Sequence, residues 1–193
     1  MGRSLLAIRI VVSVLIKYPH KHHGFTLIEL VVVIVLLGLL AATALPRYIN
    51  VSQQALTASI QGVMGGFAVG VVLIRSQWVT EGSNRGDEGI PVAIDNDVIF
   101  VNENGWPAKT SSATGSGYNN QNATECQEVW NYVLHSPPVS TTGTISNQAY
   151  FISVQGANPN ACRFSLIVNG TADTDRYFDY NLESGRVIIS PTA

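Results

Sequence analysis

The sequence predicts an α+β protein, in which a long N-terminal helix, membrane-spanning in its first half, packs its second half against a C-terminal antiparallel β-sheet. Three observations lead to this fold class. An uncharged apolar run covers residues 30–45. Apolar residues then recur at helical spacing as far as Trp78. Several short strand patterns, separated by turn residues, follow from Ala149 onward.

The apolar run is long enough to cross a membrane. With residues 25–29 added it has about 21 residues, and a helix of that length spans about 30 Å of hydrocarbon. The one charged side chain within it is Glu29. An ionised group at that depth costs several kcal/mol unless it is paired, so Glu29 is a candidate functional residue. The structural alternative is that Glu29 lies at the membrane edge and caps the helix.

The residues around Glu29 resemble a known processing signal. The string KHHG-FTLIE, followed by the apolar run and Pro46, is similar to the class III signal of type IV pilins, minor pilins and the pseudopilins of type II secretion. The resemblance implies that prepilin peptidase cleaves after Gly24 and methylates the new N-terminal residue, Phe25. It also implies that the Phe25 ammonium of one subunit neutralises Glu29 of its neighbour in a helical filament, so that neither charge is buried alone.

The resemblance also implies how the chain is divided and where it goes. Residues 1–24 are the cleaved leader, 25–45 the transmembrane and filament-core helix, and 46–193 the globular domain with the second half of the helix. The implied partners are prepilin peptidase, other pilin subunits and the assembly platform of the inner membrane. We expect a single-pass precursor in that membrane and a mature subunit in an extracellular pilus.

The leader differs from the short basic leaders typical of this family. It carries an additional apolar run, LLAIRIVVSVLI, so either the leader is unusually long or translation starts nearer to KYPHKHHG. Removal of its four positive charges takes the formal net charge of the chain from −2 to −6. A chain with that charge gives no support for direct electrostatic binding to nucleic acid.

Catalytic and metal-binding motifs are absent from the sequence. His135 is the only histidine after the leader, and the chain contains no P-loop, HExxH or GxSxG motif. We therefore expect no enzyme activity, no cofactor and no metal. Cys126 and Cys162 are the only cysteines, and an even pair in an exported domain predicts a disulfide worth about 4 kcal/mol. Two buried free thiols are the alternative.

The predicted helix continues beyond the membrane segment to about Trp78. Pro46 removes a backbone donor and is expected to kink the helix just outside the membrane. The glycines from Gly62 to Gly70 either weaken the helix or let another element approach closely, and we favour close approach. The apolar positions of this half are spaced by three or four residues and form one face, which the globular domain should cover: Leu56, Ile60, Val63, Phe67, Val71, Ile74 and Trp78.

The remaining sequence predicts one short helix and six strands. Two short strands flank Asn96-Asp97, and a turn follows at Asn104-Gly105-Trp106-Pro107. Asn122 or Thr124 caps a helix over residues 123–135. The other strands are expected at 149–155, 162–168, 177–182 and 186–190, with a Ser184-Gly185 turn joining the last two. Their expected inward side chains are Phe151, Phe164, Leu166, Phe178 and Ile188.

The function that these observations predict is a structural subunit, a major or minor pilin, of a type IV pilus that serves adhesion and surface attachment. The alternative is a type II secretion pseudopilin. Major pseudopilins often carry a calcium loop, and neither Asp95-Asn96-Asp97 nor Asp173-Thr174-Asp175 is followed by the Gly and terminal Glu of an EF-hand loop. An anchored binding or sensor protein would leave the Phe25–Glu29 spacing unexplained.

The C-terminal half suggests a subgroup within the pilins. The Gly105-Trp106-Pro107 turn, the late cysteine pair and the ending YFDYNLESGRVII resemble the mannose-sensitive haemagglutinin (MSHA) pilins of aquatic Gram-negative bacteria. This likeness covers the globular domain only as a pattern.

Overall fold

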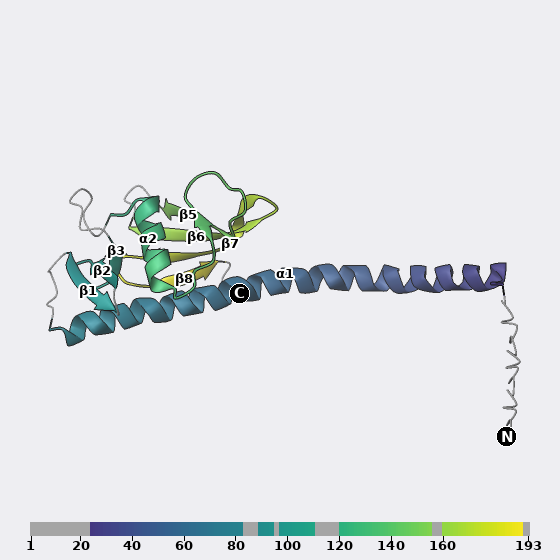
Figure 1. The fold of residues 1–193 in the computed structure, drawn as a ribbon, viewed down its shortest axis with the longest axis horizontal. Coiled ribbons are helices and arrows are strands. Elements are labelled where there is room, and N and C mark those ends of the chain that lie inside the picture. The colour runs from purple at the N-terminus through teal and green to yellow at the C-terminus, as the bar shows by residue number, and fades with distance from the viewer. Residues whose placement is uncertain (1–23, 83–88, 95–96, 111–119, 156–159, 191–193) are drawn as a thin grey trace, which may run out of the picture. The chain divides into compact units, whose positions relative to one another are not determined.

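The computed structural model describes residues 24–82, 89–94, 97–110, 120–155 and 160–190 (Figure 1). Residues 1–23 of the expected leader and the turn at 95–96 lie outside this range. Contacts within the chain group it into two units, residues 1–48 and 49–193. Helix α1 (Leu27–Thr80) begins in the first unit and ends in the second, which confirms the predicted long helix.

The second half of α1 presents the predicted apolar face to the core. Leu56 and Val63 are partly buried and pack against this core. The other members of the predicted face, spaced by three, four or seven residues along α1, are buried: Ile60, Phe67, Val71, Ile74 and Trp78. The helical period thus places a continuous stripe of side chains on one side, and the strands of the second unit cover it.

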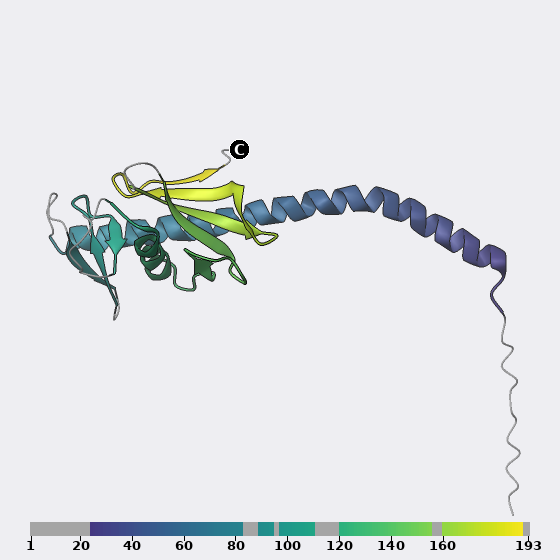
Figure 2. The same cartoon turned by 90° about the horizontal axis from the view of Figure 1, so that it is seen from above.

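Five strands form a mixed sheet in the order β4-β5-β6-β7-β8, which lies alongside this part of α1 (Figures 1 and 2). Strands β5, β6, β7 and β8 pair antiparallel, as expected. The short strand β4, which the sequence did not predict, adds one parallel pair with β5. The bounds are β4 Ser140–Thr141, β5 Tyr150–Gln155, β6 Ala161–Val168, β7 Thr171–Asn181 and β8 Val187–Ser190.

The inward face of this sheet differs in part from the prediction. Phe164, Leu166 and Phe178 point into the core, but Phe151 is only partly buried and Ile188 is 44% exposed. The register pairs Tyr150 with Leu166 and Ile152 with Phe164, and this places the neighbours of Phe151 inward. Three consecutive apolar residues in β5 carry no alternation of polarity, so the sequence could not fix the face. The Ser184-Gly185 turn joins β7 to β8 as predicted, with Gly185 at φ 69°.

A three-stranded sheet, β1 (Ile90–Ile94), β2 (Asp97–Val101) and β3 (Pro107–Lys109), follows α1 in the chain. Its first two strands pair antiparallel, which confirms the predicted hairpin. The predicted turn before Pro107 is present, since the Gly105 N–H donates to the Asn102 carbonyl at 2.8 Å. Strand β3 was not predicted because three residues are too few to show a period of two.

Helix α2 (Ala123–Val133) is shorter than predicted by two residues. Of the two candidate caps, Asn122 takes the position, and its side chain accepts from the Glu125 N–H at 3.0 Å. The Glu125 carboxylate in turn accepts from the Asn122 N–H at 2.9 Å, which completes a capping box. Cys126 of α2 and Cys162 of β6 form the predicted disulfide, and both are fully buried.

Phe67 of α1 lies at the centre of the aromatic core. Its ring centroid is 5.1 Å from that of Phe164, 5.6 Å from Phe178, 5.5 Å from Tyr180 and 6.3 Å from Trp130. The partners come from β6, β7 and α2. Such tilted and edge contacts add about 0.5–1.5 kcal/mol each beyond the burial of the rings. One side chain therefore holds α1, α2 and the sheet together.

The glycines of α1 have different environments. A Cβ atom on Gly70 would lie 2.6 Å from Val133 Cγ1 and 2.7 Å from the Val133 carbonyl oxygen, so the end of α2 approaches the helix closely here. The expectation of close approach is confirmed at Gly70. At Gly62 and Gly65 a Cβ atom would meet nothing within 4 Å. Close packing against the described residues does not explain those two glycines.

We expect Gly70→Ala to lower the free energy of unfolding of the globular unit by about 1–3 kcal/mol, because the added methyl overpacks the contact with Val133. Gly62→Ala is the matched control and should raise it by up to about 1 kcal/mol through helix propensity alone. Urea unfolding of the full chain in detergent micelles, followed by tryptophan fluorescence, measures both. Equal shifts in the two variants would contradict the close approach of α2.

A second prediction concerns Tyr150, whose buried hydroxyl has no hydrogen-bond partner among the described residues. Burial raises the pKa of Tyr150 to about 12. The raised pKa means that the stability contributed by the neutral phenol is complete below about pH 10 and is lost as pH rises toward about 12. Tyr150→Phe removes the unpaired hydroxyl and should stabilise the unit by about 1 kcal/mol at neutral pH, with a larger gain near pH 11.

The matched control is Tyr180→Phe. The Tyr180 hydroxyl donates to the Pro107 carbonyl at 2.9 Å, so its removal should lower the stability at neutral pH. Urea unfolding at both pH values compares the two variants. A loss of stability in Tyr150→Phe at neutral pH would indicate that its hydroxyl has a partner.

Candidate processing and assembly site

The expected cleavage site lies directly before α1. Gly24, Phe25 and Thr26 are exposed and not helical, and α1 begins at Leu27. The Phe25 side chain is 82% exposed, and a Cβ atom on Gly24 would meet nothing within 4 Å. The Gly24–Phe25 peptide bond therefore lies in an exposed segment without regular secondary structure.

Glu29 and Thr26 cap the start of α1 together. The Glu29 N–H donates to Thr26 Oγ1 at 3.2 Å. In return Glu29 Oε2 accepts from the Thr26 N–H at 3.4 Å and from its hydroxyl at 3.3 Å. This reciprocal arrangement is a capping box, with Thr26 at the N-cap and Glu29 three residues later. The capping role that was the structural alternative for Glu29 is thus present in the structure.

Among the described residues, the capping bonds of Glu29 come from uncharged groups and do not compensate its charge. Their lengths lie near or beyond the upper end of the usual range for N–H···O and O–H···O hydrogen bonds, so each is weak. A carboxylate in the first turn interacts favourably with the helix dipole, but by only about 0.3–1 kcal/mol. An ionised group within hydrocarbon requires a partner of opposite charge. Cleavage after Gly24 would create an ammonium group on Phe25, in the residue next to Thr26.

The first half of α1 is an apolar helix that the described chain leaves exposed. By length and composition, α1 is the kind of helix that crosses a membrane. Leu36, Leu40 and Leu45 are each more than half exposed, and no residue from 24 to 55 is buried. Exposed apolar surface on this scale marks contact with lipid or with other protein.

Pro46 lies inside α1, and the helix continues through it. The ring removes one backbone donor and crowds the carbonyl four residues earlier. The expected kink at this position remains a prediction. The boundary between the two units falls close to it, between Tyr48 and Ile49.

The acidic residues considered as cation ligands do not form a cluster where the structure describes them. Asp95 and Asn96 lie outside the described residues, and Asp173 pairs with Arg176 at 2.5 Å. Within the part of the chain that the structure describes, no three His, Cys, Asp or Glu side chains lie together in the way that a metal site requires. His135 is exposed beyond the end of α2.

The chain is similar to a known protein family and to a known pilus protein. Residues 19–45 match the family described as the prokaryotic N-terminal methylation motif. Over 107 residues the chain is 32% identical to the type IV narrow pilus major component PilA5 of Thermus thermophilus. The aligned region covers 53% of this chain and 77% of that protein. No solved structure matches the chain. The second match is much longer than the first, so the likeness extends beyond the N-terminal segment.

We expect Thr26→Val to weaken the start of α1 and Thr26→Ser to preserve it, because only serine keeps the hydroxyl of the capping box. Loss of an N-cap costs about 0.5–2 kcal/mol of helix stability. Hydrogen exchange of the amides of residues 27–30, in the full chain in detergent micelles, measures the effect. Equal exchange in the valine and serine variants would show that the Thr26 hydroxyl does not cap the helix.

Proposed function

The chain belongs to the type IV pilin family, and from that membership we propose that it is a structural subunit, major or minor, of a type IV pilus rather than an enzyme. One observation carries the proposal. The segment Phe-Thr-Leu-Ile-Glu begins a long helix, and its Thr26 and Glu29 cap that helix. The first half of the helix is apolar and exposed. The relative PilA5 is described as the major component of a pilus.

The proposed maturation begins at the accessible Gly24–Phe25 bond. Prepilin peptidase removes residues 1–24 and methylates Phe25. Residues 25–45 then hold the subunit in the inner membrane as a single span and later enter the filament core, while residues 46–193 form the globular domain. The assembly platform in that membrane and other pilin subunits are the partners, and the extracellular pilus is the destination.

In the proposed assembly step, Glu29 exchanges weak capping bonds for a full counter-charge. The Phe25 ammonium of one subunit lies against the Glu29 carboxylate of the next and neutralises it. Removal of either member of a buried pair costs about 3–5 kcal/mol, because the other is left alone in a low dielectric. A pair with this property favours one axial position of neighbouring helices over all others.

The relative favours a pilus over a secretion pseudopilus. The disulfide between Cys126 and Cys162 is expected of any exported domain and is compatible with both. The relative that covers more than half of this chain is described as a pilus component. Within the pilins, the sequence pattern of the C-terminal half supports an MSHA-like subunit, and adhesion and surface attachment are the proposed role of its filament.

Glu29→Gln tests the proposal, because it keeps the shape of the side chain and removes only the charge. The variant should be cleaved and methylated like the wild type, so intact-mass analysis should find chains that start at a methylated Phe25. Electron microscopy of sheared cells should show few or no filaments. Glu29→Asp, which keeps the charge, is the matched control and should assemble at least in part.

Two results would contradict the proposal. A mature N-terminus at a residue other than Phe25 would contradict the proposed cleavage by prepilin peptidase. Filaments of normal number and length built from the Glu29→Gln protein alone would oppose the charge pairing.

A further inference from the structure

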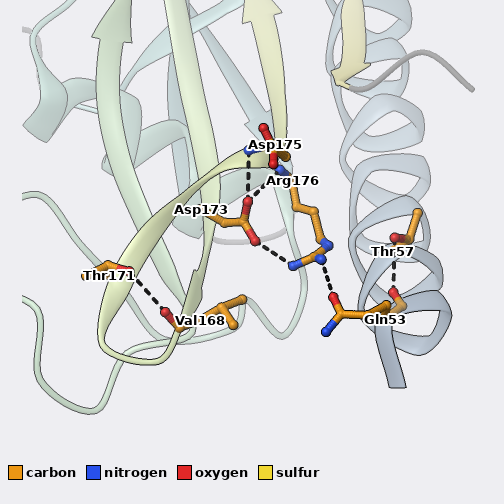
Figure 3. A network of polar contacts seen from close by, with 7 residues as sticks. All are labelled: Gln53, Thr57, Val168, Thr171, Asp173, Asp175 and Arg176. Carbon is orange, nitrogen blue, oxygen red and sulfur yellow. Dashed lines mark hydrogen bonds and ion pairs between the residues drawn. The ribbon is translucent and has the colours of Figure 1, made fainter. Parts of the chain in front are cut away.

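A bulge in β7 projects the charged side chain of Arg176 toward α1 (Figure 3). Ile167 of β6 pairs with Ala172, but Ser165 pairs with Tyr177, so β7 contains extra residues between these two positions. Residues 173–176 form this bulge. A bulge changes the direction in which a strand aims its side chains. Here it turns Arg176 out of the sheet and toward the helix.

Asp173 holds the bulge in shape. Its Oδ1 accepts from the N–H of Asp175 at 2.8 Å and from the N–H of Arg176 at 3.1 Å. Its Oδ2 pairs with Arg176 Nη1 at 2.5 Å. Both side chains are largely buried, with exposed fractions of 12% for Asp173 and 20% for Arg176. The guanidinium of Arg176 is therefore fixed by a carboxylate that is itself fixed by the backbone.

The other end of the guanidinium reaches α1. Arg176 Nη2 donates to the side-chain oxygen Oε1 of Gln53 (Figure 3). The backbone carbonyl of Gln53 accepts from the Thr57 hydroxyl at 3.2 Å. Gln53 lies two helical turns before Ile60, the first fully buried residue of the helix. Every residue of α1 before Leu56 is exposed. The Arg176 contact thus lies beyond the end of the apolar stripe, where packing no longer holds the helix.

We propose that Gln53, Asp173 and Arg176 form a clamp that fixes the point at which the globular unit releases α1, with Arg176 as its positioning residue. On the N-terminal side of the clamp, the hydrogen bonds of α1 among the described residues lie within the helix and its cap, and Pro46 interrupts the backbone series. Exposed helix without tertiary contacts opens most readily. The clamp stops such opening at Gln53. The part of α1 on the C-terminal side of Gln53, which packs against the core, therefore stays helical. This inference concerns the single chain and does not rest on the proposed function.

Because residue 53 is a glutamine, the contact with Arg176 is of intermediate strength. A neutral amide accepts from Arg176 more weakly than a carboxylate would, because charge on both partners strengthens a hydrogen bond. The clamp therefore holds the helix without locking it. Substitutions at Gln53 that change the charge should tighten or release it while leaving the apolar stripe intact.

Hydrogen exchange of the full chain in detergent micelles tests the clamp. Arg176→Ala should raise the exchange rate of the amides of residues 51–57 about three- to tenfold, with little change in β5 and β6. Gln53→Lys should raise it similarly, because two cations then face each other. Gln53→Glu should lower it, and this gain should shrink as salt is added, since a partly exposed ion pair is screened.

Gln54 provides the matched control. It is exposed on the same turn of α1, so Gln54→Lys and Gln54→Glu make the same charge changes away from Arg176. These variants should leave the exchange of residues 51–57 unchanged. Equal effects at positions 53 and 54 would overturn the proposal, and so would an Arg176→Ala variant that raises exchange only within β7. If Arg176→Ala unfolds the whole unit, the opposite effects of Lys and Glu at position 53 decide the outcome.

Discussion

The globular unit depends on the insertion of Phe67 into the aromatic core. Its ring contacts one ring of α2, one of β6 and two of β7, so the helix and the sheet share one centre. The buried disulfide between α2 and β6 links two of these elements covalently and limits how far they separate. Gly70 then allows α2 to lie close against the helix. Around this centre the remaining stripe of α1 is buried by ordinary packing.

The same helix has two halves with opposite requirements. Its second half buries one face against its own chain, while the described chain covers none of its first half. A helix of this composition needs lipid or another protein around it. Under the proposed function these two environments are the membrane and then the filament core. Glu29 fits both under the proposed function. Its capping bonds satisfy the helix start in the free subunit, and they are weak enough to be exchanged for a counter-charge.

Polar contacts define how the helix leaves the globular unit. The apolar stripe ends near Leu56, and the bulge in β7 adds one more attachment at Gln53. A hydrogen bond from a single guanidinium buries less surface than apolar packing does. Its strength also depends more on the charges of the neighbouring side chains. The sequence suggested for Asp173 only the role of an acidic residue that could bind a cation. Its role as the partner that aims Arg176 depends on a bulge whose register arises from pairing with β6.

The sequence by itself determined the features that depend on neighbours along the chain. These are the helix, its buried stripe, a cap of α2 at Asn122 or Thr124, both hairpins and the signal around Gly24, because periodicity, capping and turn chemistry act over a few residues. Tertiary structure alone decided the face of Phe151, the parallel pairing of β4, the reason for Gly70 and the contact of Arg176 with Gln53. Each of these joins residues far apart in the sequence, and strand register and close approach exist only once both partners are in place.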